Sequence, residues 1–311
     1  MRIREQGLTL VLLAALALAG CGPRDNADTS AQSDTAAAAA PAAGTDSLSI
    51  QGFSAPESVL YDEASDVYLV SNINGTPTDH DDNGFISRVS PDGSVQTLKW
   101  IDGASDSVKL NAPKGLAIMG DTLFVADIDT VRAFSRTTGA PLGARGVRGA
   151  TFLNDLAVGN GILYVTDSGL KPDFSPSGTA AVYAFQGGAA KAVAKGDATL
   201  HGPNGILATP EGLVVVPFGD KVVMRIPTAG GAPTTIATLP TGGLDGAVRL
   251  PDGSLLVTSW EGKAIYHVDT QGQVHSSVEN VESPADIGYD TKRGRVLIPQ
   301  LNVNRVEVRK R

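Results

Sequence analysis

The sequence predicts an all-β fold, a six-bladed β-propeller whose ring is closed by an N-terminal strand. Three observations lead to this prediction. The composition is rich in turn-forming residues, with 36 glycines and 18 prolines among 311 residues. After residue 48 one pattern occurs six times, and over the same region there is no sustained helical periodicity.

Each repeat has an opening residue, a variable residue, a short apolar strand, a turn and then a very apolar strand. The turns contain Gly, Asp and Asn dipeptides, which are typical of hairpins. The second strand is five or six residues of mainly Leu, Val, Phe, Tyr or Ile, which favours burial on both faces. The repeats read PESVLYDEASDVYLVSN from Pro56, PKGLAIMGDTLFVAD from Pro113, LNDLAVGNGILYVTD from Leu153, PNGILATPEGLVVVP from Pro203, LDGAVRLPDGSLLVTS from Leu244 and PADIGYDTKRGRVLIP from Pro284.

The repeats have the length of propeller blades. A third, alternating strand follows in most of them, and successive repeats begin about 40 to 57 residues apart, the range of one four-stranded blade. The last repeat ends after its third strand, which would leave a long exposed edge. Residues 47–53 (SLSIQGF) have a strand-like pattern, and we expect them to complete the sixth blade.

The N-terminal residues predict export. Residues 1–20 contain two early arginines and an apolar run over residues 8–19, which suits a signal peptide and is too short for a membrane-spanning helix. The run ends in Leu-Ala-Gly-Cys and resembles a bacterial lipobox, which implies lipid attachment at Cys21, the single cysteine. By resemblance to lipoprotein sorting signals, Gly22 rather than Asp after the cysteine implies the outer membrane, with the protein facing the periplasm.

Residues 21–47 read as the lipidated cysteine and a flexible linker, because they contain almost no large apolar residue. The globular domain is expected over residues 48–311. The formal net charge of −8 argues against nucleic acid as a partner and against broad adsorption to acidic lipid. We therefore expect contact with the membrane through the lipid anchor only.

One position of the repeat carries the predicted chemistry. The innermost strand of each blade lines the central channel, so the variable residue that opens it falls on one ring around the channel mouth. Four of the six ring residues supply oxygen, and none is histidine or cysteine, which disfavours zinc and copper. Two carboxylates and two amides suit a hard cation, above all Ca²⁺. The ring residues are Glu57, Lys114, Asn154, Asn204, Asp245 and Ala285.

These motifs resemble the senescence-marker/gluconolactonase family of six-bladed propellers, whose relatives include paraoxonases and squid-type phosphotriesterases. The first-blade motif Pro56-Glu57-Ser58-Val59-Leu60-Tyr61 is similar to that of gluconolactonase-type proteins, and places a metal-binding glutamate at Glu57. The Asn motifs fall on Asn154-Asp155 and Asn204-Gly205, and an Asp motif on Asp245-Gly246. The resemblance implies one catalytic divalent ion in the channel and a calcium-dependent hydrolase of lactones or related esters.

The predicted catalytic residues are Asp245, Asp155 and His201. Asp245 is expected to act as nucleophile or base, with Asp155 as the second choice. His201 lies three residues before Asn204, where it could reach the channel mouth. A plain surface histidine is the alternative. Substrate contacts at the mouth are predicted for Lys114, Asp127, Asp167 and Trp260, although the last three could equally be loop anchors.

Two features leave the function open. Lys114 would repel a calcium ion, so we expect it either to swing toward solvent or to sit against Glu57 and replace the ion. The second outcome would leave a non-enzymatic, membrane-anchored scaffold for protein partners, and a streptogramin-type lyase is a third hypothesis. In the first blade, Asp79, Asp81 and Asn83 begin a calcium-loop motif that Ser90 does not complete. A second calcium ion there has weak support; the loop is alternatively a solvated turn or a lid.

Overall fold

The computed structural model of the chain describes residues 47–311. The predicted signal peptide, the lipid site at Cys21 and nearly all of the linker lie outside the described residues and stay predictions. No helix among residues 47–311 is long and apolar enough to cross a membrane.

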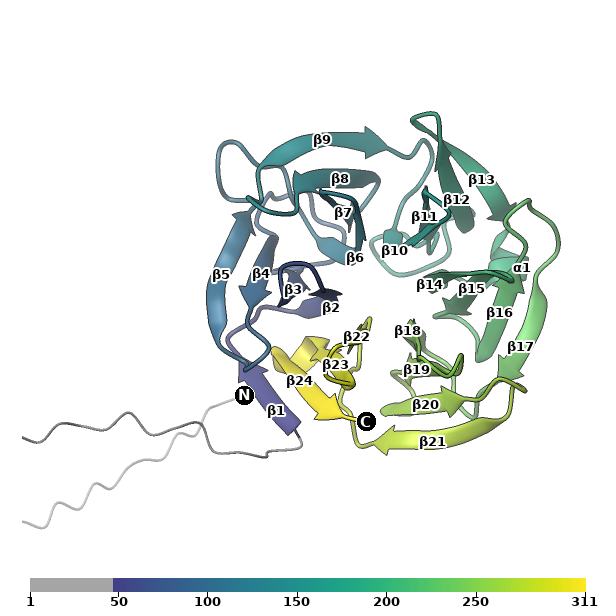
Figure 1. The fold of residues 1–311 in the computed structure, drawn as a ribbon. Coiled ribbons are helices and arrows are strands. Elements are labelled where there is room, and N and C mark those ends of the chain that lie inside the picture. Colours follow the sequence, from purple (N-terminus) through teal and green to yellow (C-terminus); the bar gives the residue numbers. More distant parts are fainter. Residues whose placement is uncertain (1–46) are drawn as a thin grey trace, which may run out of the picture. The chain divides into compact units, whose positions relative to one another are not determined.

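Six four-stranded antiparallel sheets surround a central axis, which confirms the predicted six-bladed propeller (Figure 1). Five blades use consecutive strands, ordered from the axis outward. The sixth blade has the order β22-β23-β24-β1, so the first strand of the described chain is its outermost strand. β1 (Ser47–Gln51) pairs antiparallel with β24 (Arg305–Lys310) in five residue pairs, as predicted for ring closure.

The strands of each kind have similar lengths. The inner strands are β2 (Pro56–Asp62), β6 (Pro113–Met119), β10 (Leu153–Gly159), β14 (Pro203–Thr209), β18 (Leu244–Arg249) and β22 (Gly288–Asp290). The second strands are β3 (Val67–Asn72), β7 (Thr122–Asp127), β11 (Ile162–Asp167), β15 (Gly212–Pro217), β19 (Leu255–Ser259) and β23 (Arg295–Gln300). The third strands are β4 (Phe85–Val89), β8 (Thr130–Ser135), β12 (Ala181–Gln186), β16 (Val222–Ile226), β20 (Ala264–Val268) and β24. The outer strands, besides β1, are β5 (Val95–Asp102), β9 (Pro141–Gly146), β13 (Ala189–Lys195), β17 (Thr234–Thr238) and β21 (Val274–Glu279).

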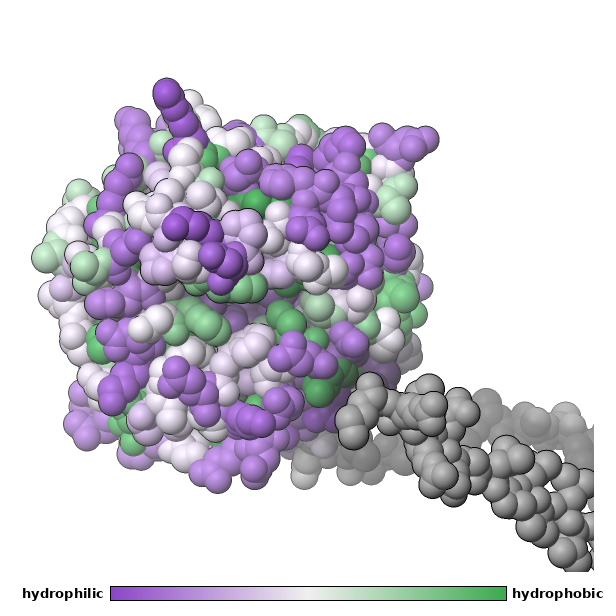
Figure 2. Space-filling model, turned by 180° about the vertical axis from the view of Figure 1, so that it is seen from behind, coloured by the Kyte–Doolittle hydropathy of each residue, from purple (hydrophilic) through white to green (hydrophobic). Residues whose placement is uncertain are grey.

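The hydrophobic core is divided among the blade interfaces. Six large clusters of buried side chains each combine residues of two neighbouring blades. One of them joins the sixth blade to the first and includes Ile50 of β1 and Tyr68 of β3. Figure 2 shows one face of the ring, where hydrophilic residues predominate and hydrophobic ones lie between them. Because every blade shares its core with both neighbours, the ring is one cooperative unit.

A β-bulge at the start of the inner strand directs the ring residues toward the axis. In β2, Pro56 pairs with Asn72 and Val59 pairs with Val70, so the inner strand has one extra residue. The same shift occurs at the start of β6, β10, β14 and β18. A bulge re-aims the side chains at its position, and each of these five bulges contains a ring residue.

The sixth blade differs from the other five. Its inner strand, β22, is only three residues long and begins at Gly288, whereas the repeat predicts a strand from Pro284. Residues 284 and 286 instead make isolated bridges, Pro284 with Gln300 and Ser58 with Asp286. The backbone N–H of Asp286 donates to the carbonyl of Glu57 at 2.9 Å. The chain thus links blade six directly to the first ring residue.

Candidate metal centre

The bulges bring the four predicted metal ligands to the floor of one cavity. Glu57, Asn154, Asn204 and Asp245 lie on β2, β10, β14 and β18, and each is only 4–6% exposed. All four line a cavity of about 430 Å³ at the channel mouth. Residues more than 180 positions apart in the sequence therefore contribute oxygen atoms to one site.

Three of these four side chains have a buried oxygen without a hydrogen-bond partner. The atoms are Glu57 Oε2, Asn204 Oδ1 and Asp245 Oδ1. The fourth residue, Asn154, donates its amide nitrogen to Ser168 Oγ at 3.1 Å, which leaves its carbonyl oxygen as the free group. Buried polar atoms are nearly always paired, so unpaired acceptors converging from separate blades fit a bound cation.

Two further buried carboxyl groups raise the negative charge of the site. Asp155 and Asp286 each follow a ring position by one residue and are 5% and 8% exposed. With Glu57 and Asp245 they make four buried acids against one buried lysine, so full ionisation would give a net charge of −3. Such a charge is costly in a dry interior unless a counter-ion offsets it.

The pKa values of these acids reflect that cost. Burial raises the pKa of Glu57 well above its ordinary value, and the charges of Asp245 and Asp286 raise it further. Burial likewise raises the pKa of Asp245. The nearby Trp260 and Asn204 side chains oppose this rise, although neither forms a hydrogen bond of normal geometry with the Asp245 carboxylate. The pKa of Asp286 is raised to about 7 by burial, against the hydrogen bond from Ser58. Without a cation the cluster favours its protonated forms.

Lys114 adopts neither of the two expected arrangements. It is 1% exposed, so the expectation that it swings toward solvent is wrong. Its Nζ donates to the carbonyls of Pro77 and Ala112, at 2.9 and 3.1 Å, and lies 4.5 Å from the ring centroid of Phe152. Burial lowers its pKa to about 8, and the charge of Glu57 opposes that change. The ammonium group therefore binds carbonyl groups in place of the Glu57 carboxylate.

The bond to Pro77 positions the loop between β3 and β4. Gly75, Thr76 and Pro77 of this loop line the cavity, in agreement with a loop lying over the channel. Asp81 accepts from the Asn83 amide at 2.6 Å, and Asp82 pairs with Lys109. Within residues 47–311 no three His, Cys, Asp or Glu side chains form a metal-binding group. The weak prediction of a second calcium site at Asp79, Asp81 and Asn83 gains no support from these contacts.

Asp155 does not line the cavity. Its Oδ1 accepts from the N–H of Leu156 at 2.6 Å, and its Oδ2 accepts from the N–H of Ile206 in the next blade at 2.8 Å. Both oxygens are therefore used by backbone groups, and the residue joins blade three to blade four. The structure places Asp155 as an inter-blade anchor, which disagrees with its prediction as a catalytic group.

His201 also lies outside the cavity at the channel mouth. It ends the short helix α1 (Asp197–Leu200), and its side chain is 42% exposed and 3.7 Å from Asp220. It lines a neighbouring cavity of about 330 Å³. The alternative of a surface loop histidine describes its position better than the catalytic prediction.

Of the four predicted mouth contacts, two line the cavity and two anchor loops. Lys114 and Trp260 line the cavity. Asp127 accepts from the N–H groups of Asn111 and Ala112 and pairs with Arg132 at 2.7 Å. Asp167 accepts in the same way from the N–H groups of Phe152 and Gly169. For these two aspartates the loop-anchor alternative is correct, because their oxygens hold the loops that surround the mouth.

Sequence reasoning missed Asp286, although the sequence has a signal for it. Asp155 and Asp286 occupy the same position of the repeat, and the preceding blade has a glycine there in both cases. A Cβ on Gly115 would lie 2.3 Å from Asp155 Oδ1, and one on Gly246 would lie 2.5 Å from Asp286 Oδ1. Each aspartate therefore requires the small residue of the preceding blade. The signal for the second acid is that a glycine is followed by an aspartate at this position in two pairs of successive blades.

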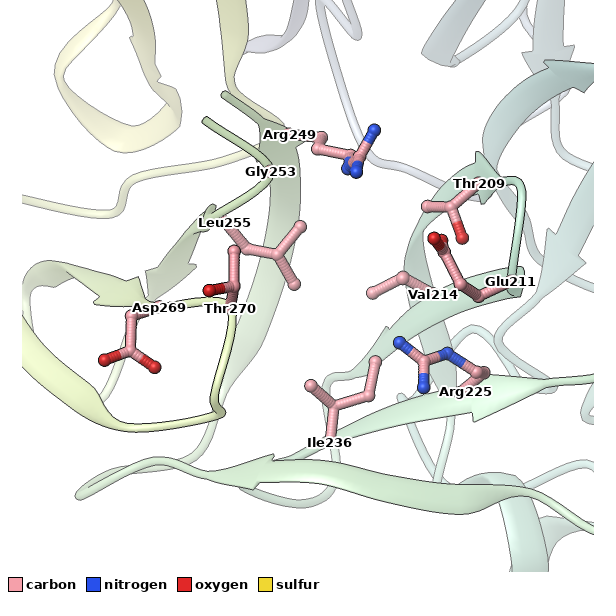
Figure 3. A pocket seen from close by; sticks show the side chains of 10 residues that line it. All are labelled: Thr209, Glu211, Val214, Arg225, Ile236, Arg249, Gly253, Leu255, Asp269 and Thr270. Carbon is pink, nitrogen blue, oxygen red and sulfur yellow. The ribbon is translucent and has the colours of Figure 1, made fainter. Parts of the chain in front are cut away.

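Another cavity lies at the opposite end of the blades. It has a volume of about 260 Å³ and is formed between the fourth and fifth blades, where β14 ends at Thr209 (Figure 3). Its charged residues are Arg225, Arg249, Glu211 and Asp269. Because positive and negative groups are equally represented, this cavity lacks the excess of acids found at the candidate metal centre.

Solved structures of propellers resemble the chain at low sequence identity. A gluconolactonase from Xanthomonas campestris matches with a TM-score of 0.64 at 18% identity, over 84% of this chain and 88% of that one. A second gluconolactonase-type protein matches with a TM-score of 0.62 at 17% identity, over 86% and 93%. Virginiamycin B lyase from Staphylococcus aureus matches with a TM-score of 0.60 at 13% identity, over 84% and 98%.

No protein-family model matches the sequence, and the search among curated proteins finds no significant match. At these identities the likeness to solved structures establishes the fold alone. The fold is common to lactone hydrolases and a lyase, so the activity has to be argued from the site.

Proposed function

We propose that this chain is a hydrolase of lactones or related esters that uses a divalent cation, with Ca²⁺ as the ion. The observation that carries the proposal is the set of unpaired, buried oxygens of Glu57, Asn204 and Asp245 on the floor of one cavity. The likeness to gluconolactonases in fold adds support for the substrate class.

The donor set fits calcium. Glu57 and Asp245 supply two negative charges, and Asn154 and Asn204 supply amide carbonyls, all of them hard oxygen ligands. The ring contains no histidine or cysteine, which disfavours zinc and copper. Asp155 and Asp286 each follow a ring position by one residue, and their charges add to the negative potential at Glu57 and Asp245.

The residues around the centre have separable roles. A bound divalent cation supplies Lewis-acid polarisation of the substrate carbonyl. Asp245 lines the cavity, where it would either attack that carbonyl as the nucleophile or act as the base for an attacking water. The indole N–H of Trp260 is buried without a partner and lines the same cavity, so it can donate to an oxygen of the substrate.

The second hypothesis, a non-enzymatic scaffold, explains fewer of the observations. A scaffold has no use for Glu57 and Asp245, two buried acids with unpaired oxygens at the cavity, because their desolvation costs stability. It would be favoured if Lys114 neutralised Glu57 directly, but the lysine instead binds the carbonyls of Pro77 and Ala112. We therefore favour the hydrolase.

An activity assay tests the proposal. Purified protein should hydrolyse δ-valerolactone or phenyl acetate, lose this activity with a chelator and regain it with Ca²⁺. Asp245→Asn should lower kcat/KM at least 100-fold, in the range found for loss of a general base, while the outward Asp252→Asn serves as the matched control. Hydrolysis that is insensitive to both chelator and Asp245→Asn would refute the proposed mechanism.

A further inference from the structure

The walls of the cavity differ in chemistry from its floor. The floor is the polar ring, whereas the walls are mostly apolar and aromatic. The main wall residues are Ile73, Phe152, Leu170, Phe174, Phe218 and Trp260. They include two aromatic pairs: the ring centroids of Phe152 and Phe174 are 6.2 Å apart, and those of Phe218 and Trp260 are 5.9 Å apart.

Two polar side chains in the walls already have hydrogen-bond partners within the protein. Ser168 Oγ donates to the carbonyl of Pro203 and accepts from Asn154. Lys114 Nζ donates to two carbonyls, as described above. Thr76 and Asn302 lie at the exposed rim. Among the described residues of the walls, the donors left for a substrate are the unpaired indole N–H of Trp260 and the third N–H of Lys114.

The mouth also exposes two large aromatic side chains. Phe174 is 56% exposed and Phe218 is 39% exposed, and both border the cavity. Contiguous exposed apolar surface at a cavity is typical of a ligand site. A substrate that covered these rings would gain free energy from the apolar area removed from water.

We propose that the substrate is a lactone with an apolar alkyl or aryl substituent, and that a polyhydroxylated sugar lactone is a poor substrate. This inference rests on the proposed function. The ester group of either compound can be bound by the ring and Trp260. The hydroxyl groups of a sugar lactone would face apolar walls, and a buried hydroxyl without a partner is costly. An alkyl or aryl substituent would instead pack against Phe152, Phe174 and Phe218.

A series of δ-lactones tests this inference. We expect kcat/KM to rise from δ-valerolactone to 5-alkyl homologues, by up to about fourfold for each buried methylene. D-Glucono-δ-lactone should be hydrolysed more slowly than unsubstituted δ-valerolactone. A preference for D-glucono-δ-lactone, or no gain with alkyl length, would overturn the inference and leave the proposed hydrolase intact. If no lactone is hydrolysed, both proposals fail.

A variant at the mouth separates specificity from stability. Phe174→Ser should lower the ratio of kcat/KM for δ-decalactone to that for δ-valerolactone several-fold, because it removes apolar wall. Leu142→Ser is the matched control, since Leu142 is 58% exposed and lies on the outer strand β9. Equal ratios in the Phe174→Ser variant and the parent would count against an apolar substituent at this position.

Discussion

At the residue scale, adjacent positions of one bulge have different tasks. The first position carries the ring residue, whose side chain reaches the cavity, as in Asp245. The second position faces the next blade, as in Asp155, which accepts from the N–H of Ile206. The second-strand hydroxyl of Thr166 accepts the N–H of Asp155 and donates to the carbonyl of Asn204 at 2.6 Å. Two acids of similar burial, at the first position of one bulge and the second position of another, therefore have opposite effects on stability.

This difference predicts opposite outcomes for two matched variants. Asp155→Asn should destabilise the metal-free protein by about 1–3 kcal/mol, because one buried backbone N–H loses its acceptor. Asp245→Asn should leave the metal-free protein as stable as the parent or more so, because it removes a repelled buried charge, but it should abolish stabilisation by Ca²⁺. Thermal unfolding with chelator and with Ca²⁺ measures both effects. Reversed results would show that the roles of the two residues are exchanged.

The pKa shifts of two ring acids and of Asp286 predict how stability depends on pH. Burial raises the pKa of Glu57, Asp245 and Asp286 above their values in the unfolded chain, in Asp286 to about 7. In metal-free protein the folded state then binds more protons than the unfolded state from about pH 4 upward, and for Asp286 this window extends to about pH 7. The contribution of these groups is present at low pH and is lost as the pH rises through that window.

Calcium should weaken this dependence, because it favours the ionised acids. Melting temperatures measured at several values between pH 5 and 8 should therefore fall more steeply in chelator than in excess Ca²⁺. The pKa of Asp66 is lowered by Arg293 and Lys292, so its contribution to stability is lost as the pH falls, and only below this pH range. That contribution should be equal in chelator and in Ca²⁺. Parallel curves would argue against a cation at the ring acids.

The sequence could predict the ring residues but could not assign their partners. Glu57, Asn154, Asn204 and Asp245 share one position of a repeat, so the fold alone brings them together. The environment of Lys114, by contrast, depends on a carbonyl 37 residues earlier in the chain, in an irregular loop. The role of Asp155 depends on an N–H group in another blade. Neither contact follows from periodicity.

At the element scale, β1 joins the start of the described chain to its end. It covers the edge of β24, and its Ile50 is 5% exposed in the core shared by blades six and one. Burial of that side chain alone contributes about 1.5–3 kcal/mol. An uncovered β24 would also present an open edge.

We therefore expect deletion of residues 47–51 to lower the thermal midpoint of the whole ring in one cooperative transition. Deletion of residues 23–46, which have the composition of a linker, is the control and should leave the midpoint unchanged. Equal midpoints for both deletions, measured by calorimetry, would contradict closure by β1.

Strands with a strong hydrophobic pattern could be predicted from the sequence, and strands with a weak pattern could not. The second strands are buried along almost their whole length, so their apolar runs identify them. The outer strand β9 is exposed at all six residues and reads PLGARG, which has no strand signal. The repeat wrongly predicts a strand at residues 284–287, because it shows the opening residues but not their bridges to β2 and β23.

At the scale of the whole molecule, four bulged inner strands bring oxygens from four blades to one axis. No single blade contains two of the four proposed ligands, so the proposed centre requires the closed ring. Propellers with this architecture include both gluconolactonases and a lyase. The closed ring therefore sets where a site can form, and the ring residues decide its chemistry.

Calcium binding by the purified protein tests the central claim most directly. Calorimetric titration of the parent should give one Ca²⁺ per chain at the ring, with binding lost in Glu57→Gln and Asp245→Asn. Lys114→Asn should bind somewhat more tightly, because it removes a nearby positive charge. A hundredfold excess of Ca²⁺ over the Kd should stabilise the parent by about 2.7 kcal/mol. A parent that binds no Ca²⁺, together with a Lys114→Asn variant that does, would show that the lysine replaces the ion and would contradict the proposed metal centre.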